Sequence, residues 1–123
     1  MDKHIHVAST LTLVFIFLLC HATTLVSAVD DPWTGLPVPP EPSPGFYKHL
    51  QACADVLTRD CGLEIYNYVL GSGHVGPPCC QKLKQMGETC NNDLAFALGR
   101  FDKYKKAALI IKTKSARMFS TCH

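Results

Sequence analysis

The residues with the most chemical potential in this sequence are its cysteines, and two of them are adjacent. The stretch GPPCCQKLKQMGETC places Cys79 directly beside Cys80, and Cys90 follows at a short distance. Zinc sites usually separate paired cysteine ligands by about two to four residues, so that several sulfurs converge on one ion. Adjacent cysteines do this poorly, because on a helix successive side chains point ~100° apart. We interpret the doublet as a structural branch point that joins one helix to two other parts of the chain.

The N-terminal segment decides how many cysteines the mature protein keeps. An apolar run, LTLVFIFLLC, follows MDKHIHVAST, and Val26 and Ala28 have the small-residue pattern that precedes signal-peptide cleavage. We therefore expect residues 1–28 to be a removed secretory signal, with the mature protein secreted through vesicles and without a stable membrane span. A membrane anchor is the alternative, but the apolar run is shorter than the ~20 residues that a spanning helix needs.

Removal of this segment takes Cys20 with it and leaves an even number of cysteines. In a short secreted chain, that number indicates a disulfide framework. Each bond typically adds ~2 to 4 kcal/mol of stability, which matters in a domain whose core is small. The expected disulfide cysteines are Cys53, Cys61, Cys79, Cys80, Cys90 and Cys122.

Composition divides the mature chain into a leader and a domain. Residues 29–45 are rich in proline, which fixes φ and lacks a backbone donor, so we expect an extended, polyproline-like leader outside the core. PVPPEPSP also resembles a ligand of proline-recognition modules, but those modules are mostly intracellular, and we favour a linker. Residues 46–123 form the expected domain.

Hydrophobic periodicity predicts about four helices in this domain and hence an all-α, disulfide-stapled bundle. A second helix is predicted over Leu63–Leu70, ending at Gly71, and a third opens at Pro77 and Pro78, with Gly87 as a point of weakness or bending. The apolar stripes are Phe46, Leu50, Cys53 and Leu57 for the first helix, Ile65, Tyr66 and Val69 for the second, Cys79, Leu83, Met86, Cys90, Leu94, Leu98 and Phe101 for the third, and Phe101, Tyr104, Ala108, Ile111, Ser115, Phe119 and Cys122 for the fourth.

The cysteine spacing, together with CADVLTRDCGLEIYNYVL and CCQKLKQMGETCNNDLAFAL, resembles a known family over residues 46–122. It is similar to the plant prolamin-like domain of egg-cell-secreted and early-culture-abundant gametogenesis-related proteins. That domain is a six-cysteine relative of lipid-transfer proteins, seed albumins and bifunctional inhibitors. Lipid-transfer proteins carry eight cysteines with a Cys-x-Cys pair, whereas Asn91 and Asn92 follow Cys90 here, so one bond of the larger set is absent.

By analogy with the eight-cysteine fold, the resemblance implies the pairs Cys53 with Cys90, Cys61 with Cys79, and Cys80 with Cys122, although sequence alone cannot choose among connectivities. It also implies a non-enzymatic role in plant reproduction, in gamete or female-gametophyte signalling and the regulation of double fertilisation. Lipid binding or transfer is the alternative function. Inhibition of a hydrolase is a further alternative, without an identifiable reactive loop.

Other motifs have simple structural interpretations. GSGHVG, residues 71–76, matches the glycine pattern of a dinucleotide-binding turn, but it follows a predicted helix instead of a strand, and we predict a flexible interhelical loop. Asp55, Asp60 and Glu64 are interpreted as caps and solvated charges. The mature histidines, His49, His74 and His123, are expected at the surface, and we expect neither metal nor cofactor.

Basic residues gather near the C-terminus, where residues 100–123 contain Asp102 as their only carboxylate side chain. This face could meet an anionic membrane, a pectic polysaccharide or an acidic receptor loop, or it could be a solvated helix face. Secretion argues against nucleic acid. The apolar stripes could line a lipid tunnel, although a filled core is favoured in so small a domain. We expect an unidentified cell-surface or extracellular protein partner to contact Gly71, Ser72, Gly73, His74, Lys103, Lys105, Lys106, Lys112, Lys114 and Arg117.

Overall fold

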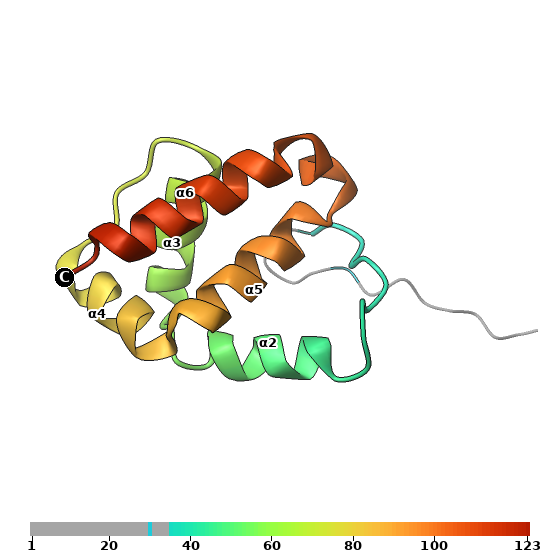
Figure 1. Ribbon diagram of the computed structural model, residues 1–123, viewed down its shortest axis with the longest axis horizontal. Helices are drawn as coiled ribbons and strands as arrows, with labels where there is room; N and C mark the ends of the chain where they lie inside the picture. Colours follow the sequence, from blue (N-terminus) through green and yellow to red (C-terminus); the bar gives the residue numbers. More distant parts are fainter. Residues whose placement is uncertain (1–29, 31–34) are drawn as a thin grey trace, which may run out of the picture.

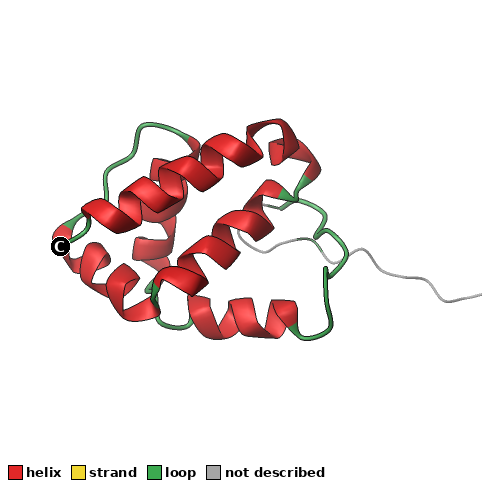
Figure 2. Ribbon diagram, viewed as in Figure 1, coloured by secondary structure: helices red, strands yellow, loops and turns green. Residues whose placement is uncertain are grey.

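Helices dominate the part of the chain described by this computed structural model, which is Asp30 and residues 35–123 (Figures 1 and 2). The expected signal at residues 1–28 lies outside that part. No strand occurs in it, apart from an isolated bridge between Asp30 and Pro37. The predicted all-α fold class is thus confirmed. The elements are α2 (Phe46–Ala54), α3 (Arg59–Leu70), α4 (Pro77–Met86), α5 (Glu88–Gly99), the 3-10 helix η1 (Asp102–Ala107) and α6 (Ala108–Thr121).

Helix α3 begins earlier in the chain than the apolar pattern predicts. The pattern places its start at Leu63, but the helix begins at Arg59, because Thr58 caps it. The Thr58 Oγ1 accepts a hydrogen bond from the backbone N–H of Cys61 at 3.2 Å, which satisfies a donor that the first turn leaves without a helical partner. Cys61 therefore lies on a regular helix and not in the preceding turn.

The single third helix of the sequence prediction is two helices, α4 and α5, separated at Gly87. Pro77 and Pro78 open α4, as predicted. Gly87 has a φ of 95°, a backbone conformation that side chains with a β-carbon rarely adopt. Its N–H donates to the carbonyl of Leu83 at 3.2 Å and ends α4, and the next residue begins α5 in a new direction (Figure 1).

The core lies where α5 and α6 run side by side, with α2, α3 and α4 packed around them (Figure 1). Leu83, Ile111 and Met118 are essentially inaccessible to solvent. Met118 is absent from the predicted stripe of the last helix, whereas Phe119, which is in that stripe, is only partly buried beneath the Lys84 ammonium, 4.1 Å from the ring centroid. The omission of Met118 is therefore corrected, whereas Phe119 still packs against the core, and Ile111, Ser115 and Cys122 of the predicted stripe are buried.

A buried polar pair connects α5 to α6 within this core. Asn91 and Ser115 are each only 3% exposed. The Ser115 hydroxyl donates to Asn91 Oδ1 at 3.1 Å, and Asn91 Nδ2 donates to the Ser115 carbonyl at 3.3 Å. Because buried polar groups need partners, this reciprocal pair fixes which residue of α6 faces which residue of α5.

The proline-rich leader is tied to the domain more closely than its composition indicates. Leu36 is partly buried and packs against the core, so the expectation that the leader lies wholly outside the core is wrong at this residue. The Tyr47 hydroxyl donates to the carbonyl of Pro39, and Arg100 Nη2 donates to the carbonyl of Pro40 at 2.9 Å. Since prolines offer acceptors without donors, side chains of the domain supply the donors.

Candidate functional site: the surface formed by the α3–α4 loop and the basic residues

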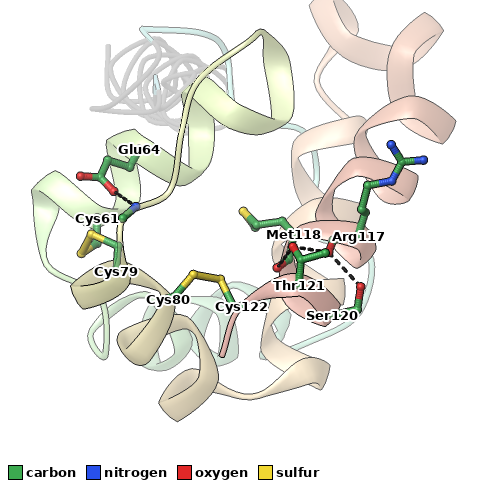
Figure 3. Close-up of a disulfide and its surroundings, with 10 residues drawn as sticks. Cys61, Glu64, Cys79, Cys80, Arg117, Met118, Ser120, Thr121 and Cys122 are labelled. Carbon is green, nitrogen blue, oxygen red and sulfur yellow. Dashed lines mark hydrogen bonds between the residues drawn. A yellow bond between two sulfur atoms is a disulfide. The ribbon is translucent and has the colours of Figure 1, made fainter.

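Three disulfides set the positions of the helices that carry the candidate residues. Cys53–Cys90 joins α2 to α5, Cys61–Cys79 joins α3 to α4, and Cys80–Cys122 joins α4 to the residue that follows α6. Their Cα–Cα distances of 5.5, 5.1 and 5.1 Å are typical of disulfides. These are the same pairs that the family resemblance implies. The two bonds of the doublet leave α4 toward different neighbours, as Figure 3 shows.

The loop of residues 71–76, between α3 and α4, is anchored at both ends. At its start, Lys114 of α6 donates through Nζ to the carbonyl of Gly71. At its end, the backbone N–H of Gly76 donates to Glu64 Oε2 of α3 at 3.0 Å (Figure 3). Glu64 therefore has a defined partner and is more than a solvated charge. The prediction of a flexible loop is corrected to that of a loop held against two helices.

Gly73 holds the middle of the loop against the end of α3. A β-carbon at this position would lie 2.8 Å from the backbone nitrogen of Tyr68 and 2.9 Å from the carbonyl carbon of Asn67. Those distances are too short for any side chain, so the close approach requires glycine. Ser72 and His74, on either side of it, are exposed. The anchored loop thus presents these two side chains to solvent.

The basic residues of the predicted partner-binding set divide into separate groups. Lys114 is partly buried beside the loop, with its ammonium 5.5 Å from the centroid of the Tyr68 ring, and Arg117 is exposed one turn later on the same side of α6. Lys112 is exposed on the opposite side of α6, because two residues correspond to about 200° of helical rotation. The expectation of one continuous basic face is therefore wrong.

The remaining lysines of the set lie on η1. All three are exposed, and Lys105 forms an ion pair with Asp102 at 2.5 Å. The Lys103 ammonium lies 5.4 Å from the centroid of the Tyr104 ring. Lys106 completes the group at the end of η1. In the structure, Lys114 therefore contacts the α3–α4 loop. The η1 lysines form a separate group that precedes α6 in the chain.

A group of potential metal ligands forms at the α2–α5 contact, although the spacing of the histidines does not predict it. His49 Nε2 lies 2.9 Å from Asp93 Oδ2 and 3.7 Å from the sulfur of Cys53. Cys53 and Cys90 are joined to each other, so neither sulfur is a thiolate that could ligate a cation. The His49–Asp93 pair is a contact between α2 and α5. The two residues are 44 positions apart in the sequence, so the linear pattern does not predict their contact.

The other carboxylates in the first helix junction have the structural roles expected of them. Asp55 caps the C-terminus of α2 and accepts a hydrogen bond from Gln51 Nε2 at 2.8 Å. Asp60 lies in the first turn of α3, where a negative charge is favoured by the helix dipole. Asp55 thus has a side-chain partner within α2, and Asp60 has a favourable position in α3.

An open surface depression lies on α4 beside the C-terminal residue, lined by Pro77, Gln81, Lys84, Gln85 and His123. It is an open depression on the surface and not an enclosed cavity of the kind that buries most of a small ligand. Of the helices in the described ranges, none combines the length and the apolar character needed to cross a membrane.

Comparisons with known proteins agree with this architecture. Residues 52–122, more than half of the chain, match the model of the family described as Prolamin-like. A curated relative, Protein DOWN-REGULATED IN DIF1 11 of Arabidopsis thaliana, is 27% identical over 75 residues, which are 61% of this chain and 50% of the relative. The chain thus spans about half the length of the curated relative that it matches. No solved structure matches it significantly.

Proposed function

Because this chain belongs to the Prolamin-like family, we propose that it is a secreted, non-enzymatic protein of plant reproduction that presents a recognition surface to a protein on another cell. Membership supports the coarser description of a small, cysteine-rich plant protein, in a family that is generally not enzymatic and typically extracellular. The role in gamete or female-gametophyte signalling is the finer part of the proposal.

We locate this surface from one observation, which is that the α3–α4 loop is anchored to the helices beside it. Lys114 and Glu64 hold its ends, and the close approach of Gly73 holds its middle. A loop whose backbone is fixed before binding loses little conformational entropy when a partner arrives, which favours affinity. We define the recognition surface as Ser72 and His74 of the loop together with Arg117 of α6, all of which are exposed.

The proposal is tested with the oxidised, secreted protein and a variant that carries Ser72→Ala, His74→Ala and Arg117→Ala. These changes truncate exposed side chains and leave the anchoring residues in place, so the fold should survive. Labelled protein is applied to isolated gametes and female-gametophyte cells, and bound label is measured. We expect saturable binding of the natural protein and at least about tenfold weaker binding of the variant, because a few central side chains usually dominate an interface.

A matched control carries Lys48→Ala in α2 and Asn92→Ala in α5, both of which are exposed residues outside the recognition surface. The control should bind as the natural protein does and restore seed set in plants that lack the protein, whereas the recognition variant should restore neither binding nor seed set. Full activity of the recognition variant in both assays would refute the location of the surface. Absence of saturable binding by the natural protein would refute the proposed function itself.

A further inference from the structure

Two large apolar side chains at the start of α6 are highly exposed. Leu109 is 76% exposed and Ile110 is 61% exposed, more than the other exposed large apolar residues in the described part of the chain, Leu63 and Phe96. Phe96 has an aromatic partner, since its ring packs edge to face against the ring of Phe46, with 5.9 Å between the ring centroids. Exposure of two neighbouring large aliphatic side chains loses the stabilisation that burial would provide, so these two residues are candidates for contact with another surface.

Lysines surround this apolar pair on the same helical segment. Lys105 and Lys106 lie one turn before Leu109, at the end of η1, and Lys112 lies one turn after it on α6. All three lysines are exposed. We refer to Lys105, Lys106, Leu109 and Ile110 as the basic tip, which lies where η1 turns into α6 at one end of the molecule (Figure 1). Lys112 flanks Leu109 but lies about 200° of helical rotation from Ile110.

The charge of the basic tip has one sign. Asp102 is the only acidic side chain between residue 94 and the C-terminus, and it is already paired with Lys105 at 2.5 Å. An acidic polysaccharide would complement the lysines but would leave Leu109 and Ile110 in water. An anionic bilayer complements both, since its headgroups carry negative charge and its acyl boundary accepts apolar side chains a few ångströms below them.

We propose that the basic tip docks on the surface of an anionic lipid bilayer, with Leu109 and Ile110 inserted among the headgroups and Lys106 paired with lipid phosphates. This is a contact with the membrane surface and not a span. It uses none of the three side chains of the recognition surface, and it does not depend on the proposed function. The docked protein would contact the membrane through the basic tip, and the α3–α4 loop would not be part of that contact.

The test is co-sedimentation of the oxidised protein with vesicles of phosphatidylcholine and phosphatidylserine in equal parts, compared with phosphatidylcholine alone. We expect binding to the anionic vesicles only, weakened as salt rises toward about 0.15 M. Lys106→Ala should bind about fivefold more weakly, the usual contribution of one lysine near an anionic surface. Leu109→Ser combined with Ile110→Ser should bind about tenfold more weakly because insertion is lost.

Matched controls place the same chemical changes on other helices. Lys48→Ala in α2 and Leu63→Ser in α3 remove an exposed lysine and an exposed leucine, and both variants should bind anionic vesicles as the natural protein does. Tryptophan at position 110 (Ile110→Trp) should show a blue-shifted emission with anionic vesicles, and Leu63→Trp should show none. The proposal is overturned by failure to bind anionic vesicles, by binding that survives Leu109→Ser with Ile110→Ser, by equal losses in the control variants, or by binding to pectic acid in place of vesicles.

Discussion

The reciprocal pair of Asn91 and Ser115 gives the sharpest test of how α6 is positioned. Both side chains are 3% exposed and are joined by hydrogen bonds of 3.1 and 3.3 Å. Ser115→Ala leaves a buried amide oxygen without its donor, which should lower the free energy of unfolding by about 1 to 3 kcal/mol. Asn91→Leu, similar in size, should lower it by a comparable amount because the serine hydroxyl loses its acceptor.

The double variant should be less destabilised than the sum of its parts. Once Asn91 and Ser115 are both apolar, no orphaned polar side chain remains, so we expect a coupling free energy of about 1 to 2 kcal/mol. Urea unfolding of the oxidised proteins measures it, and in a domain of this size each 1 kcal/mol corresponds to roughly 4 to 8 °C in Tm. If the two single effects simply add in the double variant, the pair does not act as one unit and the reasoning is refuted.

Other predictions concern the loop and the disulfides. Glu64→Ala should lower the free energy of unfolding by about 1 kcal/mol and speed hydrogen exchange of the loop amide that it accepts from, measured by mass spectrometry; unchanged exchange would argue against the anchor. Gly73→Ala should cost about 1 to 3 kcal/mol in urea unfolding, because backbone must move to admit the methyl group; a neutral effect would contradict the close approach. Replacing both Cys80 and Cys122 by serine opens a loop with a sequence separation of 42 and should cost about 4 kcal/mol; a loss below about 1 kcal/mol in urea unfolding would contradict the cross-link.

Periodicity predicts the helices well because burial on one side is what makes short helices stable. Val69, Leu83 and Ile111 belong to the predicted stripes and are buried. The sequence predicts only a weak point at Gly87 and not a break, because a glycine within a helical pattern indicates flexibility, while its φ of 95° depends on how the flanking helices dock. The pattern selects Phe119 in place of the buried Met118, because a stripe can step by three or by four residues and the two positions differ by about 100° of rotation.

The contacts that build the site depend on distances that a linear pattern does not contain. Lys114 meets Gly71 across 43 residues of sequence, and His49 meets Asp93 across 44. Each residue alone is typical of a solvated surface. Only the docking of α6 on α3 and of α2 on α5 brings the partners together, and that docking follows from the disulfides and the core as a whole.

The order of the disulfides along the chain affects how the protein would withstand proteolysis. The Cys61–Cys79 bond lies entirely within the segment closed by Cys53–Cys90, and that segment overlaps the one closed by Cys80–Cys122. Every peptide bond from residue 53 to residue 122 therefore lies inside at least one covalent ring. A protease that cuts once, even in the exposed α3–α4 loop, produces a nicked molecule whose two pieces remain joined, so no single cleavage within this span can release a fragment carrying part of the surface.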